Sequence, residues 1–288
     1  MSEEIITNSE KTEAGSAELC SAAERATRSL LKTYRKRIWA PFISAVKEYG
    51  LIKEGDRIAV CMSGGKDSAL LAVLMKQLQR YSDFPFEVCY IVMNPGYSEE
   101  NMAKIYENAA KLELPIDVFE TNIFGVTEKT EKNPCYLCAR MRRGHLYSYA
   151  RSKGCNKIAL GHHFSDVIET TLMGMLWGAQ IQGMLPKLNS TNYEGMELIR
   201  PLYKVHEDDI ISWAKYNDLS FLACACRMTD ASVMDEDKSK RRETKRLIKE
   251  LKKTNPDVEK NIFNSIHMAN VDTLVGYKLH GVKHPWEG

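Results

Sequence analysis

Apolar positions along the chain switch between short runs and longer helical periodicities. Four short apolar runs predict strands, at residues 57–62, 86–93, 116–120 and 157–160. Helical patterns lie between these runs, at residues 68–80, 98–112 and 135–152. Strands separated by helices of this length pair in parallel through right-handed crossovers. The pattern therefore predicts an α/β fold with a Rossmann-like parallel sheet.

Helical patterns also flank the predicted sheet. Residues 21–49 predict one or two basic amphipathic helices interrupted at Pro41, and further patterns follow at 165–179, 206–217, 238–253 and 257–269. Residues 1–20 are polar with little periodicity, which is typical of a disordered leader. We expect this leader, N-terminal basic helices over 21–49, a nucleotide-binding domain over 50–220 and a C-terminal segment with cysteines and basic helices over 221–288.

The loop after the first predicted strand carries the most specific motif, Ser63-Gly64-Gly65-Lys66-Asp67-Ser68. Backbone N–H groups converge at such a strand-to-helix turn, and the helix N-terminus adds positive charge, so the turn suits a phosphate. A Walker A loop would need Gly at 60 and Ser or Thr at 67, where this chain has Val60 and Asp67. The motif instead resembles the SGGxDS loop of PP-loop ATP pyrophosphatases. The resemblance implies that Ser63, Gly64, Gly65, Lys66, Asp67 and Ser68 bind ATP.

Other candidate ATP-binding residues follow the second and fourth predicted strands: Met93, Gly161, His162 and Asp166. Ligands of open parallel sheets bind outside the carboxyl ends of the strands, so these residues should lie beside the phosphate loop. A pair of histidines such as His162 and His163 is also common in capped loops. Mg²⁺ takes oxygen ligands; Asp67 is the better candidate because it lies inside the loop, and Asp166 is the second.

Composition and charge narrow the class of protein. The 288 residues are 44% hydrophobic and 27% charged, and no apolar run is long enough to span a membrane. The acidic, polar N-terminus lacks the features of a signal peptide, so we expect a cytoplasmic protein. The formal net charge of +2 conceals an asymmetry: residues 238–253 carry nine Lys or Arg and two Glu, a local +7, which leaves −5 for the rest.

Further basic stretches are Arg25–Arg37, with six Lys or Arg, and Arg140–Arg143. Each stretch alone is typical of a solvated helix face. Beside an ATP-dependent domain, the three together predict a polyanion bound across several elements. The candidate contacts are Arg35, Arg37, Arg140, Arg142, Arg143, Arg241, Arg242 and Lys245.

Two of the cysteine clusters, Cys135-Tyr-Leu-Cys138 and Cys224-Ala-Cys226, suggest chemistry. In a reducing compartment such clusters bind metal or are redox-active more often than they form disulfides. Cys135 and Cys138 fall at i and i+3 of a helix start, so their thiols share a face, and the helix N-terminus favours the thiolate. Cys61 and Cys89 lie in apolar runs and are expected in the core.

The stretch Cys135–Gly144 resembles the CxLCxRxRRG segment of the tRNA 2-thiocytidine synthetases, or tRNA-cytidine 2-sulfurtransferases. In that family the segment lies between the phosphate loop and a GHHxxD segment, as it does here. The resemblance covers roughly residues 25–230, and its other matches are Glu54–Ile58, Lys157–His163, Gly183–Leu188 and Ile199–Leu202. It implies the PP-loop, or adenine nucleotide alpha-hydrolase, type of fold.

The resemblance implies an ATP- and Mg²⁺-dependent enzyme that adenylates the C2 oxygen of an anticodon-loop cytidine, position 32 of tRNA, and replaces it with sulfur. It implies Asp67, Cys135, Cys138 and Cys224 as catalytic residues, with the three cysteines holding a [4Fe–4S] cluster. The implied partners are tRNA and a sulfur donor (a cysteine desulfurase or free sulfide). Composition predicts no membrane partner, and a homodimer is left open.

One departure leaves the third ligand open. The family has P-C-x-x-C where this chain has Ala223-Cys-Ala-Cys226, so Cys224 fits the ligand position and Cys226 is the alternative. Other interpretations of the site are a persulfide on Cys138 or Cys224 that modifies another nucleoside such as uridine, and a structural zinc on all four cysteines. A tRNA-binding protein without catalysis is the remaining alternative, and the intact phosphate loop argues against it.

Overall fold

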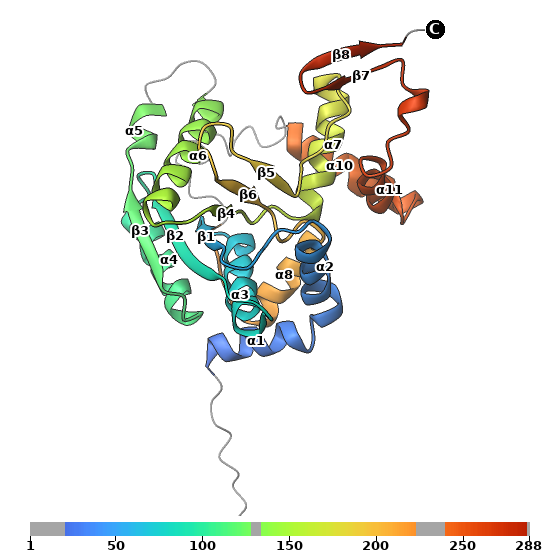
Figure 1. Cartoon of the computed structure of the whole chain (residues 1–288). Coiled ribbons are helices and arrows are strands. Elements are labelled where there is room, and N and C mark those ends of the chain that lie inside the picture. The colour runs from blue at the N-terminus through green and yellow to red at the C-terminus, as the bar shows by residue number, and fades with distance from the viewer. Residues whose placement is uncertain (1–20, 128–133, 223–239, 287–288) are drawn as a thin grey trace, which may run out of the picture.

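A six-stranded sheet forms the centre of the molecule (Figure 1). The computed structural model describes residues 21–127, 134–222 and 240–286. The strand order is β3-β2-β1-β4-β6-β5. The strands are β1 (Arg57–Met62), β2 (Glu87–Asn94), β3 (Ile116–Glu120), β4 (Lys157–Ala159), β5 (Lys187–Asn189) and β6 (Glu197–Ile199). Every pairing is parallel except that of β5 with β6.

The parallel α/β fold predicted from the apolar runs is therefore confirmed. The order places β1 between β2 and β4, with β2 leading outward to β3 on one side. The direction of strand addition reverses after β3, so β1 and β4 form the topological switch point where such sheets bind ligands.

Helices cover the sheet and connect its strands (Figure 1). Between the strands lie α3 (Lys66–Tyr81), α4 (Glu99–Lys111), α5 (Ile123–Thr127), α6 (Pro134–Ser152), α7 (Phe164–Gly178) and, after β6, α8 (Glu207–Tyr216). Nine residues of α3 are buried, since the helix packs between the sheet and the N-terminal helices.

The N-terminal segment forms α1 (Ala22–Leu31), a π-helical turn (Arg35–Trp39) and α2 (Ala40–Glu48). A capping box of Ser21 and Glu24 starts α1. Pro41 was expected to interrupt the helical segment, and it lies instead in the first turn of α2. A proline is tolerated there, because the N–H groups of the first turn have no hydrogen-bond partner within the helix. The side chains of Leu30 and Phe42 are fully buried in the main core cluster, so these helices belong to the core of the α/β domain.

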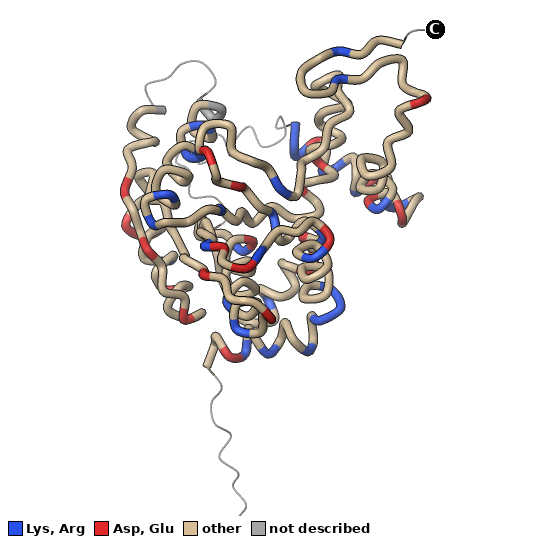
Figure 2. The backbone as a smooth tube through the Cα atoms, in the orientation of Figure 1, with Lys and Arg blue, Asp and Glu red and all other residues tan. Residues whose placement is uncertain are grey.

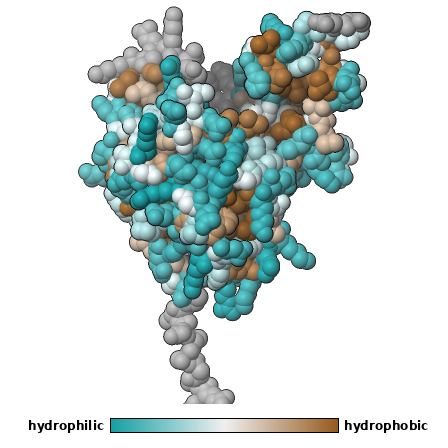
Figure 3. All heavy atoms as spheres, viewed as in Figure 1, coloured by the Kyte–Doolittle hydropathy of each residue, from teal (hydrophilic) through white to brown (hydrophobic). Residues whose placement is uncertain are grey.

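The C-terminal part comprises α10 (Lys240–Thr254), α11 (Val258–Ser265), a 3₁₀ turn (Val271–Thr273) and the hairpin of β7 (Gly276–Leu279) and β8 (Val282–Pro285). Helices α10 and α11 pack against α7, where Ile248 and Phe263 are buried beside Phe164. The hairpin lies at the end of the molecule (Figure 1), and Figure 3 shows hydrophobic side chains on this part of the surface. No helix among the described residues is long and apolar enough to cross a membrane.

Candidate nucleotide-binding site

The phosphate loop makes a tight turn between β1 and α3. Gly64 has φ +81°, a left-handed conformation, and a Cβ there would lie 2.8 Å from Cγ1 of Ile105 and 2.9 Å from Cδ1 of Leu222. Both the conformation and the space therefore require glycine. The backbone N–H of Ser63 donates to Oγ of Ser68 at 3.2 Å, so the loop is braced by its own hydroxyl groups before any ligand binds.

The end of β4 approaches the start of α3 closely. A Cβ on Gly161 would lie 3.0 Å from the carbonyl carbon of Asp67 and from the amide nitrogen of Ser68. Both are backbone atoms and cannot swing aside. This contact brings the segment after β4 against the phosphate loop, as the sheet-edge argument predicts.

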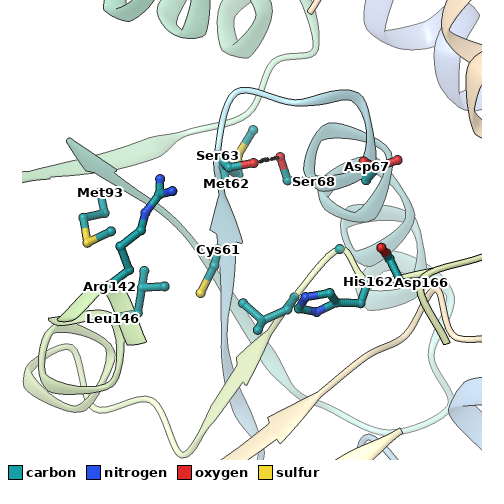
Figure 4. A pocket seen from close by; sticks show the side chains of 12 residues that line it. Cys61, Met62, Ser63, Asp67, Ser68, Met93, Arg142, Leu146, His162 and Asp166 are labelled. Atoms are coloured by element: carbon teal, nitrogen blue, oxygen red, sulfur yellow. Dashed lines mark hydrogen bonds between the residues drawn. The ribbon is translucent and has the colours of Figure 1, made fainter. Parts of the chain in front are cut away.

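A pocket of about 280 Å³ opens where these segments meet (Figure 4). Its lining contains Ser63, Asp67, Ser68, Met93, Gly161, His162 and Asp166 of the predicted ATP-binding set, together with Cys61, Met62, Arg142, Leu146 and Leu160. The lining does not include Gly64, Gly65 or Lys66, which lie in the loop beside it. Arg142 comes from α6 and donates to the hydroxyl of Tyr97 at 2.7 Å. Sequence reasoning assigned Arg142 to tRNA and did not place it in this pocket.

His162 offers an uncommitted ring nitrogen to this pocket. Its Nδ1 is buried and has no hydrogen-bond partner. Burial lowers the pKa of His162 to about 4, and the neighbouring charge of Asp166 opposes this only in part. The imidazole is therefore neutral at neutral pH and can exchange a hydrogen bond with a bound ligand.

The two candidate Mg²⁺ ligands differ in their engagement. One carboxylate oxygen of Asp166 accepts from the backbone N–H of His163 at 3.0 Å, and the other accepts from Arg241 at 2.8 Å. Oδ1 of Asp67 is buried without a hydrogen bond, 3.3 Å from Nζ of Lys66 and 3.7 Å from Nε2 of His163. An unsatisfied carboxylate oxygen in the phosphate loop fits a hard cation, and Asp67 fits better than Asp166.

Two further carboxylates join this cluster, and sequence reasoning missed both. Glu207 begins α8, and its Oε1 lies 3.1 Å from Nζ of Lys66. Glu169 of α7 is almost fully buried, and its Oε2 accepts from Arg241 at 3.1 Å. Burial raises the pKa of Glu169 to about 7, although Lys245 and Arg241 oppose the shift. The acidic start of α8 was the only available signal for Glu207, and Glu169 had none beyond the helical pattern around it.

The candidate metal-binding cysteines are described only in part. Cys135 and Cys138 lie in the first turns of α6, and the thiol of Cys138 is half-buried and outside any disulfide. Cys224 and Cys226 lie outside the described residues. The described chain before them ends at Leu222, whose backbone N–H donates to the carbonyl of Gly64 at 3.3 Å. Among the residues that the structure describes, no group of three or more His, Cys, Asp or Glu is arranged to hold a metal.

The basic candidates for tRNA binding fall into two groups. Arg35, Arg140 and Arg143 are exposed on the surface. Figure 2 shows the row of Lys and Arg along the N-terminal helices, where Arg37 is also exposed but pairs with Asp209 at 3.1 Å. Arg241 is half-buried and Lys245 is exposed, but both pair with carboxylates at the site: Asp166, Glu169 and Glu207. Arg242, beside them on α10, is half-buried.

A mostly parallel sheet with an SGGKDS loop at its carboxyl edge defines the PP-loop class of ATP-binding proteins. The sequence model of the PP-loop domain matches residues 24–235, most of the chain.

Curated relatives narrow the class. A tRNA-cytidine(32) 2-sulfurtransferase of Coxiella burnetii is 32% identical over 241 residues, covering 82% of this chain and 90% of the relative. One from Geotalea daltonii is 35% identical over 240 residues, covering 82% and 92%. The chain belongs to the tRNA-cytidine 2-sulfurtransferase family of PP-loop proteins, as the motifs predict.

Among solved structures, the chain is similar to a U34-tRNA thiolase of Methanococcus maripaludis determined with its [4Fe–4S] cluster. The TM-score is 0.62 at 20% identity, and the match covers 79% of this chain and 76% of the thiolase. At this identity the likeness supports the fold alone.

Proposed function

We propose that this protein is a tRNA sulfurtransferase that uses ATP to replace the C2 oxygen of an anticodon-loop cytidine, at position 32, with sulfur. Membership of the tRNA-cytidine 2-sulfurtransferase family supports the proposal. The observation that carries it is the shared pocket: Asp67 and Ser68 of the phosphate loop line the same cavity as Arg142 of α6, the helix in which Cys135 and Cys138 lie.

Two displacements account for the exchange of oxygen for sulfur. The C2 oxygen of the base attacks the α-phosphorus of ATP, the bond to the β-phosphate bridge breaks, and pyrophosphate leaves. A sulfur nucleophile then attacks C2, and AMP departs with the former C2 oxygen. Adenylation is needed because a carbonyl oxygen is a poor leaving group and AMP is a good one.

The loop residues act on the charge that develops on pyrophosphate. The N–H groups at the start of α3 and the ammonium of Lys66 stabilise this charge in a geometry set before the reaction. Asp67, with its unsatisfied Oδ1, is the residue that would hold Mg²⁺, which would supply positive charge to the phosphates. The neutral imidazole of His162 and the guanidinium of Arg142 face the remaining space of the pocket, where the base and the α-phosphate would meet.

The cysteines supply the donor set of an iron–sulfur cluster. Cys135, Cys138 and Cys224, or Cys226 in place of the last, are the thiolates that would hold [4Fe–4S], and their chemistry fits it. Such a cluster would supply an iron able to bind sulfide. Cys135 and Cys138 lie in the first turns of α6. The partners on this proposal are tRNA and a sulfur donor, either a cysteine desulfurase or free sulfide.

Asp67→Ala tests the proposal. The variant should lose ATP–pyrophosphate exchange and tRNA thiolation by roughly 100-fold, because the phosphates lose their organising carboxylate. The fold should persist, since the Asp67 side chain is 30% exposed and lies in the first turn of α3. Asp208→Ala is the matched control, because Asp208 is an exposed carboxylate in the first turn of α8. Nucleoside mass spectrometry of the tRNA identifies the modified base. Thiolation at the wild-type rate by Asp67→Ala, or sulfur on a uridine, contradicts the proposal.

A further inference from the structure

A single carboxylate links the phosphate loop to the basic helix α10. Oε1 of Glu207 lies 3.1 Å from Nζ of Lys66, and Oε2 lies 2.6 Å from Nζ of Lys245. The three residues come from three elements, α3, α8 and α10. The proposed chemistry gives Lys66 a role at the phosphates and leaves Glu207 and Lys245 without one.

Glu207 keeps its charge in this position. Its side chain is only 17% exposed, and burial works against the charged form. The hydrogen bond from Lys245 and the charge of Lys66 nevertheless lower the pKa of its carboxyl to about 2. At neutral pH a charged carboxylate therefore competes with any bound phosphate for the ammonium of Lys66. Partial burial makes that competition stronger than it would be on an exposed surface.

The inner face of α10 is held at the site by this and by neighbouring contacts. Arg241 pairs with Asp166 and Glu169, and Lys245 also lies 3.9 Å from Glu169. Thr244 and Ile248 are buried on the same face. The position of α10 is therefore tied to carboxylates that themselves contact the phosphate loop or the segment after β4.

We propose that Glu207 is a positioning residue that couples ATP binding to the docking of α10. The inference rests on the proposed binding of ATP at the phosphate loop. When the phosphates of ATP bind the ammonium of Lys66, Glu207 loses that ion pair and interacts with Lys245 alone. The ion pair between Glu207 and Lys245 then becomes stronger and stabilises the packing of α10 at the site. Removal of Lys245 does the reverse: Glu207 then holds Lys66 alone and opposes ATP binding. The coupling is the same in both directions, because linked binding equilibria are reciprocal.

A double-mutant cycle tests the coupling through the dissociation constant of a non-hydrolysable ATP analogue with Mg²⁺. Lys245→Met should weaken binding roughly tenfold, within the usual range of coupling between sites. In the Glu207→Gln background the same change should have no further effect, because a neutral amide does not compete for Lys66. Lys245→Met also removes the ion pair between Lys245 and Glu169. Glu207→Gln leaves that ion pair in place, so any effect of losing it would still be seen when Lys245→Met is made in the Glu207→Gln background.

Glu259→Gln is the matched control. Glu259 pairs with Lys252 at 2.6 Å and ties the far end of α10 to α11. This variant loosens α10 without touching the phosphate loop, so analogue binding should be unchanged. A weakening equal to that of Lys245→Met would show that general docking of α10 matters and would overturn the role of Glu207.

Hydrogen exchange gives a readout independent of affinity. The analogue should slow amide exchange in α10 of the wild type and of Glu259→Gln, and should leave it unchanged in Glu207→Gln. The coupling would be overturned if Lys245→Met weakened analogue binding equally in the wild type and in Glu207→Gln. It would also be overturned if the analogue protected α10 in Glu207→Gln as much as in the wild type. Either result leaves ATP binding at the phosphate loop intact. A wild type that does not bind the analogue at all would instead overturn the proposed function, and the coupling with it.

Discussion

At the scale of single residues, the candidate site depends on backbone approaches that leave no room for a side chain. Gly161 carries the end of β4 to within van der Waals distance of the backbone of Asp67 and Ser68. That approach sets the distance between the phosphate loop and His162, the next residue along the chain. The motif residues could be predicted because loop and strand end are each continuous in sequence. Glu169 and Glu207 could not be predicted, because each lies on a helix whose sequence pattern indicates only which residues are buried.

Gly161→Ala should lower ATP affinity at least tenfold and cost roughly 1–3 kcal/mol of unfolding free energy. The added Cβ would meet Asp67 and Ser68 backbone atoms at 3.0 Å, and forcing an extra methyl group into a packed site typically destabilises by about this much. ATP titration and urea unfolding measure both effects. Gly144→Ala is the control. Gly144 lies within α6, and the nearest atom to a Cβ there would be Oη of Tyr193 at 4.0 Å. Alanine at this helical position should raise the free energy of unfolding by about 0.5–1 kcal/mol. Unchanged ATP affinity in Gly161→Ala would contradict the close-approach argument.

At the scale of elements, strands β1 to β4 were predictable, and β5, β6 and the C-terminal hairpin were not. The run at 57–62 matches β1 because five of its six residues are buried. β4, β5 and β6 have three residues each, too few for a periodic pattern, but only β4 is buried at all three and therefore forms a continuous apolar run. The hairpin β7–β8 is almost entirely exposed, so no alternation of burial marks it, and its turn is His280-Gly281 rather than the usual Asn-Gly. The π-helical turn Arg35–Trp39 likewise has no signal in a pattern read at helical period.

Helix α10 illustrates what a charge count leaves out. The sequence predicts a basic helix that binds tRNA, but the charge count does not say which face of the helix packs against the rest of the protein. Arg241 and Lys245 pair with carboxylates beside the nucleotide site, although Lys245 is itself exposed. Arg246, Lys249 and Lys253 are also exposed, and Lys253 pairs with Glu250 on the same helix. On the proposed function, we expect Arg246, Lys249 and Lys253 to contact RNA phosphates, and Arg241 and Lys245 to act at the nucleotide site.

Replacing Arg246, Lys249 and Lys253 together with Ala should therefore weaken tRNA binding and flatten its salt dependence. For each duplex phosphate that is no longer neutralised, the slope of log affinity against log salt should fall by roughly 0.9. Filter binding or fluorescence titration at several salt concentrations measures the slope. Lys104→Ala with Lys111→Ala is the control, because both lysines pair with Glu107 on α4, far along the chain from α10. A slope equal to that of the wild type would mean that this face of α10 is only solvated.

At the scale of the whole molecule, three distant stretches of chain converge on the phosphate loop. Arg142 reaches the pocket from α6, and Leu222, just before the second cysteine cluster, hydrogen-bonds to the loop. Lys245 of α10 is linked to the loop through Glu207, which pairs with both Lys245 and Lys66. The PP-loop match ends at residue 235, so α10, α11 and the hairpin lie beyond it. The phosphate loop alone therefore predicts only ATP use, because the other parts of the site come from distant stretches of the chain. The thiolation proposal also needs the α6 cysteines and the segment after Leu222.

The cysteines give the prediction that depends on this convergence. Anaerobically prepared protein should be brown and contain about four irons per chain, as expected for one [4Fe–4S] cluster. Cys135→Ala, Cys138→Ala and Cys224→Ala should each lose the colour and tRNA thiolation, because a cluster with a missing thiolate is released. Cys89→Ser is the control, since Cys89 lies in β2 outside the cluster set. Cys226→Ala decides the third ligand: if it loses the cluster while Cys224→Ala keeps it, the ligand is Cys226. Iron and sulfide analysis with absorption spectra checks each variant, and stoichiometric zinc with full activity and no iron would refute the cluster.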